Sequence, residues 1–160
     1  MTEQRKQIVS LRMSATDLRK VREIARRLSV RESDVFRFAI KTTLAKLGPL
    51  YEQSVRGSDL VPIFIECGSE LATYFDLDST QLEAIINGGV DDPLKRVDKD
   101  DIELLAMSGA QEHYLYKRLK QVVTSPADSV GTSALLRRYL FAKYISDGSQ
   151  VLEGGEGRIR

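Results

Sequence analysis

The chain has 160 residues, of which 29% are charged, and its formal net charge is +1. A chain of this length holds one or two small domains, and no apolar run approaches the roughly 20 residues that span a bilayer. The single cysteine, Cys67, excludes an intrachain disulfide. Since the N-terminal residues also lack the apolar core of a signal peptide, we expect a cytoplasmic protein with no membrane contact.

The small net charge hides a division along the sequence. Residues 1–48 hold 12 basic and 5 acidic side chains, a net charge of +7, whereas residues 49–160 hold 12 basic and 18 acidic ones, a net charge of −6. Such asymmetry is typical of a nucleic-acid-binding segment joined to a domain with another task. The expected parts are a DNA-binding module (1–48), a linker or helix extension (49–57), a helical domain (58–148) and a flexible tail (149–160).

Residues 8–14 are predicted to form a short β-strand, because the side chains alternate between an apolar and a mixed face. The apolar face consists of Val9, Leu11 and Met13, and the mixed face of Ile8, Ser10 and Arg12. A single strand leaves its backbone groups and its apolar face without partners. We therefore expect the same strand of a second copy to complete a two-stranded ribbon, of the kind that reads a DNA groove.

Two amphipathic helices are predicted after the strand. Ser14 and Asp17 have capping-box spacing, and an apolar stripe continues to Leu28 opposite a basic face. The second helix is expected to begin near Ser33 and to end at Gly48-Pro49. So short a module buries too little apolar surface alone. We expect a homodimer whose core contains Val9, Leu11, Met13, Phe36, Ile40 and Leu44.

This order of elements over residues 6–47 resembles the ribbon-helix-helix repressors, the class of Arc and the methionine repressor. The resemblance implies contacts to DNA bases by Ile8, Ser10 and Arg12. It also implies phosphate contacts by Lys6 and by the start of the second helix, where free backbone amides form an anion site. The residues expected there are Arg31, Glu32 and Ser33.

About five short helices are predicted beyond residue 58. Apolar stripes place them near residues 61–75, 79–86, 98–105, 110–123 and 132–145. Pro62 suits a first helical turn, although a strand at residues 63–65 is an alternative. The whole chain is therefore predicted to be mainly α: a dimeric ribbon-helix-helix module of one strand and two helices, followed by a small helical domain.

No catalytic set, metal site or cofactor is predicted. His113 is the only histidine and Cys67 the only thiol, too few for a zinc site of three or four ligands. We expect Cys67 in the core and His113 on the surface. Helix-cap electrostatics and solvation account for the acids Asp91, Asp92, Asp98, Asp100, Asp101 and Glu103.

These features predict a homodimeric, sequence-specific DNA-binding transcriptional regulator that is not an enzyme. Its expected partners are double-stranded DNA and a second copy of itself, as a dimer or a dimer of dimers. An alternative is an antitoxin or plasmid-partition protein whose C-terminal domain binds a protein partner. Another is a regulator with a small-molecule pocket among its C-terminal helices.

Overall fold

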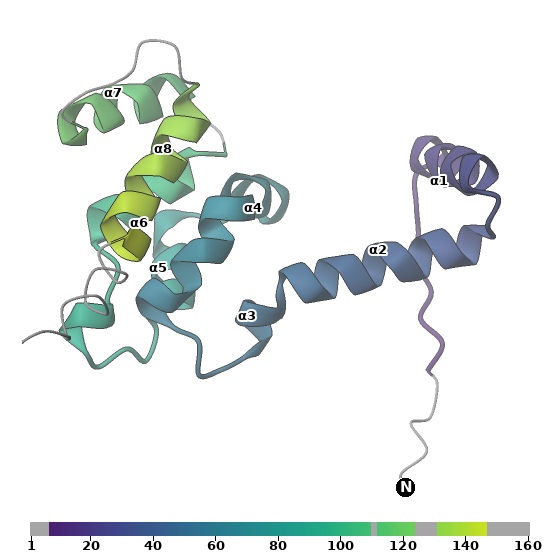
Figure 1. Cartoon of the computed structure of the whole chain (residues 1–160), viewed down its shortest axis with the longest axis horizontal. Helices are drawn as coiled ribbons and strands as arrows, with labels where there is room; N and C mark the ends of the chain where they lie inside the picture. The colour runs from purple at the N-terminus through teal and green to yellow at the C-terminus, as the bar shows by residue number, and fades with distance from the viewer. Residues whose placement is uncertain (1–6, 110–111, 124–130, 147–160) are drawn as a thin grey trace, which may run out of the picture. The chain divides into compact units, whose positions relative to one another are not determined.

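The computed structural model describes residues 7–109, 112–123 and 131–146. The chain divides into two compact units, Met1–Lys46 (unit 1) and Leu47–Arg160 (unit 2), and each is described by itself (Figure 1). The division falls close to the charge boundary at residue 48. Across the ranges that the structure describes, no helix is long and apolar enough to cross a membrane.

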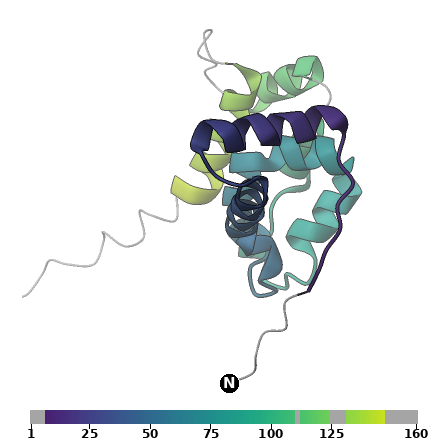
Figure 2. The same ribbon diagram turned by 90° about the vertical axis from the view of Figure 1, so that its right-hand side faces the viewer.

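Unit 1 contains the two predicted helices, α1 (Ala15–Leu28) and α2 (Glu32–Lys46), which pack on each other in a crossed arrangement (Figure 2). Ser14 is confirmed as the N-cap of α1, since its hydroxyl accepts a hydrogen bond from the Asp17 backbone N–H at 3.0 Å. The reciprocal bond of a capping box is not formed, because the Asp17 carboxylate accepts from the Ser14 hydroxyl instead, at 2.7 Å. Ser29 ends α1 in the left-handed conformation, with φ at 54°, where glycine is the common residue.

The predicted strand is wrong. Residues 7–14 precede α1 as coil, and none of the residues that the structure describes belongs to a strand. Alternating side chains define two faces, but a strand also needs a hydrogen-bonding neighbour, and the single chain supplies none to this segment. The N-terminal module is therefore corrected from a ribbon-helix-helix unit to a coil followed by a helix pair. The prediction that the chain is mainly α is confirmed.

The junction between the units also differs in detail from the prediction. α2 ends at Lys46, and the Gly48-Pro49 pair begins a further short helix, α3 (Gly48–Tyr51). Proline is tolerated there because the first amides of a helix have no intrahelical acceptor. The segment predicted as linker or helix extension therefore opens with one helical turn.

Unit 2 contains a bundle of the five predicted helices. They are α4 (Val61–Phe75), α5 (Ser79–Asn87), α6 (Lys99–Met107), α7 (Glu112–Val122) and α8 (Thr132–Phe141). Short 3₁₀ turns lie at Gly57–Leu60 and Pro93–Lys95, and a π-helical turn at Ala142–Ser146 extends α8. α4, α6 and α8 pack together, α7 contacts α6 and α8, and α5 packs against α6.

The core of unit 2 draws apolar side chains from all five of these helices. Its largest fully buried members include Leu82, Ile86, Ile102, Leu105, Leu115, Leu119 and Leu140. Cys67 is confirmed as a core residue, and its thiol donates a hydrogen bond to the Ile63 carbonyl. His113 is exposed, as predicted. The alternative strand at residues 63–65 is excluded, because these residues lie inside α4.

Candidate nucleic-acid interface

Unit 1 leaves most of its apolar side chains in solvent. Among residues 7–46 the only buried side chain is Ala25. The predicted dimer-core residues Val9, Leu11 and Leu44 are 79%, 67% and 66% exposed, and Phe36 is half-buried. Met13 and Ile40 are exposed as well. The helix pair alone therefore lacks the core that would hold it together.

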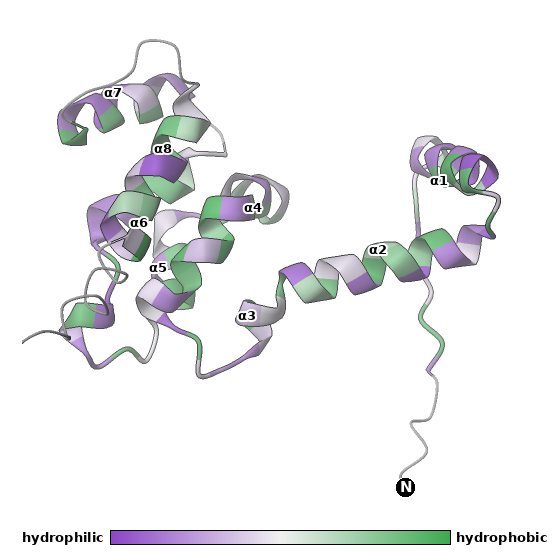
Figure 3. Ribbon diagram, viewed as in Figure 1, coloured by the Kyte–Doolittle hydropathy of each residue, from purple (hydrophilic) through white to green (hydrophobic). Residues whose placement is uncertain are grey.

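An open apolar groove lies between α1 and α2, and Figure 3 shows apolar residues recurring along α2. Its lining residues are Ile24, Leu28, Val30, Asp34, Val35, Phe38, Ala39, Thr42 and Thr43. Phe38 is 71% exposed, and the sequence reasoning missed it because it lies off the main apolar stripe of its helix. A contiguous apolar surface of this kind marks an interaction site.

The basic side chains of unit 1 fall into two groups according to their acidic partners. Five of them form ion pairs: Lys20 with Asp17, Arg22 with Glu32, Arg26 with Glu23, and both Arg31 and Arg37 with Asp34. Within the described part of unit 1, Arg12, Arg19, Arg27 and Lys41 have no acidic partner. These four cations are exposed and available to an anionic ligand.

The three predicted base-contacting residues, Ile8, Ser10 and Arg12, all lie exposed in the coil before α1. Ile8 is 98% exposed, so it has no role in packing within one chain. The predicted phosphate contact Lys6 lies outside the described residues.

At the start of α2, the predicted phosphate contact Arg31 already has an acidic partner within the protein. The Asp34 carboxylate accepts hydrogen bonds from the Arg31 backbone N–H at 3.4 Å and from the Arg31 Nε at 3.0 Å. The hydrogen bond from the Arg31 guanidinium lowers the pKa of Asp34 below its ordinary value. Glu32 pairs with Arg22 at 3.4 Å, and Ser33 lies inside the first turn rather than before it. A phosphate that binds Arg31 would therefore have to compete with the Asp34 carboxylate.

A polar cluster in unit 2 was missed by the sequence reasoning. Asp101 is 1% exposed and accepts hydrogen bonds from Tyr139 Oη at 2.9 Å, from Lys143 Nζ at 2.6 Å and from Tyr144 Oη. Lys143 also contacts the Asp98 carboxylate, and the Asp98 backbone N–H donates to Tyr144 Oη at 2.9 Å. Asp101 lies in the first turn of α6 as predicted, but the prediction that it is solvated is wrong. The cluster joins the start of α6 to the end of α8.

The cluster connects two helices of unit 2 and is unsuited to proton transfer. Burial opposes the charge on Lys143, but its hydrogen bonds to Asp101 and Asp98 outweigh this effect and raise the pKa of Lys143. Burial, together with the hydrogen bond to Asp101, likewise raises the pKa of Tyr144. A general acid or base works best with a pKa near the operating pH, whereas both groups keep their protons at neutral pH. No group of His, Cys, Asp and Glu suited to a metal ion occurs in the described ranges.

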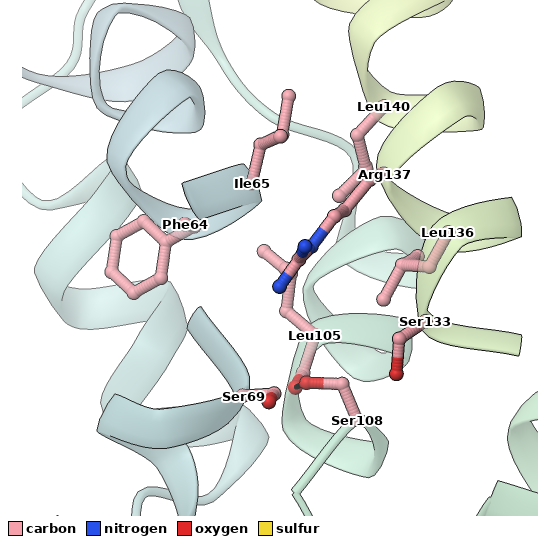
Figure 4. A pocket seen from close by; sticks show the side chains of 9 residues that line it. All are labelled: Phe64, Ile65, Ser69, Leu105, Ser108, Ser133, Leu136, Arg137 and Leu140. Carbon is pink, nitrogen blue, oxygen red and sulfur yellow. Dashed lines mark hydrogen bonds between the residues drawn. The ribbon is translucent and has the colours of Figure 1, made fainter. Parts of the chain in front are cut away.

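A small pocket between α4, α6 and α8 is lined by Arg137, three serines and apolar side chains (Figure 4). Its volume is about 20 Å³. A single water needs roughly 10–15 Å³ of such space, so this pocket admits little more than one water. It gives no support to a small-molecule effector held among these helices.

No family model, curated protein or solved structure matches the chain.

Proposed function

We propose that the chain is a homodimeric, sequence-specific DNA-binding transcriptional regulator of the cytoplasm. The observation that carries this proposal is the combination, in unit 1, of a net charge of +7 over residues 1–48 with an apolar surface that one chain leaves open. Positive charge favours binding to the DNA phosphate backbone, and the open apolar surface favours pairing with a second copy. The resemblance of residues 6–47 to ribbon-helix-helix repressors supports DNA binding by a dimer, although the strand that it implied is absent.

The exposed side chains of α1 and α2 provide the driving force for dimerisation. Ile24, Leu28, Phe38, Ile40 and Leu44 are each at least 46% exposed. In a two-fold symmetric dimer the same surface of each copy is buried, so every such residue contributes twice. Burying one large apolar side chain fully contributes roughly 1.5–3 kcal/mol, while association costs about 4–15 kcal/mol in lost freedom. The dimer has ten such side chains, five from each copy, and burying them therefore offsets the cost of association.

Ser10 and Arg12 are the residues to which we assign base contacts. Both are exposed in the coil before α1. An arginine that is free of an acidic partner can donate two hydrogen bonds to guanine in the major groove, and Ile8 can contact a thymine methyl group. Two copies of the coil in a dimer would double these contacts and favour a palindromic site.

The other free cations of unit 1 suit the phosphate backbone. Arg19 and Arg27 are exposed on α1, and neither has an acidic partner among residues 7–46. Phosphate contacts fix the position of a protein on DNA without reading its sequence. Arg31 would join them only if its ion pair with Asp34 opens, and Ser33 would contribute through the start of α2.

The test is the substitution Arg12→Ala in the full chain, with binding measured on a duplex selected from a random pool and on an unselected duplex. We expect affinity for the selected duplex to fall about 10- to 100-fold, the loss of one specific arginine–guanine contact. The matched control Lys41→Ala removes an exposed, unpaired charge from α2. This control should lower the affinity for both duplexes to a similar extent, and by less than Arg12→Ala lowers the affinity for the selected duplex.

Either of two results contradicts the proposal. If Arg12→Ala keeps both the affinity and the preference of the wild type, Arg12 does not read bases. If the wild type enriches no sequence from the pool and its affinity for DNA depends only on salt concentration, unit 1 contributes nonspecific electrostatic binding alone.

A second candidate function, protein binding by unit 2 as in an antitoxin or partition protein, is favoured by one specific feature. The adjacent aromatic side chains Tyr74 and Phe75 are 84% and 58% exposed at the end of α4. They lie next to a groove with acidic side chains, and the chemistry of this groove indicates what kind of partner it would bind.

A further inference from the structure

A groove on unit 2 lies where α4 and α6 both end. It is lined by Asp76, Leu77, Asp78, Ser79, Glu103, Ala106 and Met107. The Thr73 hydroxyl lies within hydrogen-bond distance of the Ser69 carbonyl at 2.8 Å and of the Gly109 carbonyl at 3.0 Å, so the two helix ends lie close together. Leu77, Ala106 and Met107 are half-buried, whereas Asp76 and Asp78 are exposed. The groove therefore combines an apolar base with an acidic rim.

Two exposed aromatic rings precede the groove in the chain. The rings of Tyr74 and Phe75 meet edge to face, with their centroids 5.1 Å apart. Exposed aromatic side chains beside a groove are typical of the contact surfaces by which proteins bind one another. The flexible Met107 side chain can adapt to different apolar groups entering the groove.

The electrostatics at the Asp76 end of the groove favour a cation. α4 ends at Phe75 and α6 ends at Met107, and each helix C-terminus carries a partial negative charge from its last carbonyl groups. Asp76, directly after α4, adds a full negative charge at a position where a cation would be favourable. Among the residues that the structure describes, it has no basic partner. Glu103 contributes a carboxylate that Arg118 contacts at 3.2 Å.

We propose that this groove binds a cationic amphipathic segment of a partner protein. An apolar side chain of the segment would enter the base formed by Leu77, Ala106 and Met107. Its lysines or arginines would face Asp76 and the two helix ends, and one of them would lie over the Tyr74 ring, where a cation is attracted to the aromatic face. This inference is independent of DNA binding by unit 1.

The test uses the full chain and a fluorescein-labelled helical peptide of leucine and lysine, about 18 residues or five turns long, followed by fluorescence anisotropy. A second peptide carries glutamate in place of each lysine. We expect the lysine peptide to bind and the glutamate peptide to bind at least tenfold more weakly. Phe75→Gln and Asp76→Asn should each weaken binding of the lysine peptide about five- to tenfold, as for the loss of one apolar or one charged contact. Asparagine is chosen at Asp76 because it tolerates the left-handed backbone there, with φ at 51°.

Matched controls distinguish binding in the groove from nonspecific hydrophobic and electrostatic binding elsewhere on unit 2. Leu94→Gln removes an apolar side chain that is 91% exposed outside the groove, and Asp91→Asn removes an exposed acid that does not line it. Both should leave peptide affinity within twofold of the wild type.

Three outcomes overturn the proposal. If the two peptides bind equally well, the charge of the segment does not determine binding. If the variants and the controls lose the same affinity, the peptide does not bind in the groove. If instead Arg26→Gln with Arg27→Gln strengthens peptide binding tenfold or more, the basic helix α1 of the chain itself competes for the groove. The proposal of a separate protein partner then fails.

Discussion

The substitution Lys143→Met should destabilise unit 2 strongly, because it removes the counterion of a buried carboxylate. The Asp101 side chain is 2% exposed, and Lys143 Nζ lies 2.6 Å from it. Removing one partner of a buried ion pair costs about 3–5 kcal/mol. Two features reduce this figure: the Lys143 side chain is 35% exposed, and Asp101 keeps the hydrogen bonds from Tyr139 and Tyr144. We therefore expect a loss of about 2–3 kcal/mol in the free energy of unfolding.

Urea unfolding followed by tyrosine fluorescence measures this loss in the full chain. All 6 tyrosines lie in unit 2 and the chain has no tryptophan, so the signal reports on unit 2 without interference from unit 1. Lys99→Met is the matched control, because Lys99 pairs with Glu83 at 3.7 Å and its side chain is 76% exposed. An exposed ion pair contributes about 0–1 kcal/mol. If the two variants lose the same free energy of unfolding, the ion pair between Lys143 and Asp101 contributes no more than an exposed ion pair.

Two further predictions concern pH and assembly. The pKa values of Lys143 and Tyr144 are raised above their ordinary values of 10.5 and 10.0, so their stabilisation is complete below about pH 10 and is lost as the pH rises further. Tyrosine-detected urea unfolding at pH 7 and pH 11 should show this loss, and Tyr144→Phe should make it smaller. Leu44→Glu, which charges a side chain that is 66% exposed in the single chain, should shift the protein from dimer to monomer in sedimentation. Leu94→Glu, the exposed control in unit 2, should leave the dimer intact, and a dimer unaffected by Leu44→Glu would exclude this face as the interface.

The helices were predictable because their signals are local. Ser14 caps α1 through a hydrogen bond only three residues along the chain, and Pro62 lies in the first turn of α4 as expected. The segment before α1 was not predictable in the same way. Alternation among residues 8–14 assigns side chains to two faces, whereas a strand depends on a backbone partner that a single chain does not supply.

The buried position of Asp101 could not be predicted either, because no local signal in the sequence distinguishes it from the other five acids within residues 91–103. Packing selects one of them: Lys143 and Tyr139, which are 42 and 38 positions away, converge on Asp101. Long-range contacts of this kind carry no local signature. The open face of unit 1, in contrast, followed from simple reasoning about how little a short module can bury.

The two units differ in how much apolar surface they bury, and under the proposed function this difference would link assembly to DNA binding. Unit 2 has a core of buried side chains such as Leu82, Ile102 and Leu140, whereas residues 7–46 of unit 1 bury only Ala25. If unit 1 gains its stability from a second copy, its folding and its dimerisation are one equilibrium that depends on protein concentration. DNA that contacts both copies then stabilises the dimer by mass action. Under the proposed function, occupancy of the DNA site would therefore depend on the protein's concentration as well as on the sequence of the site.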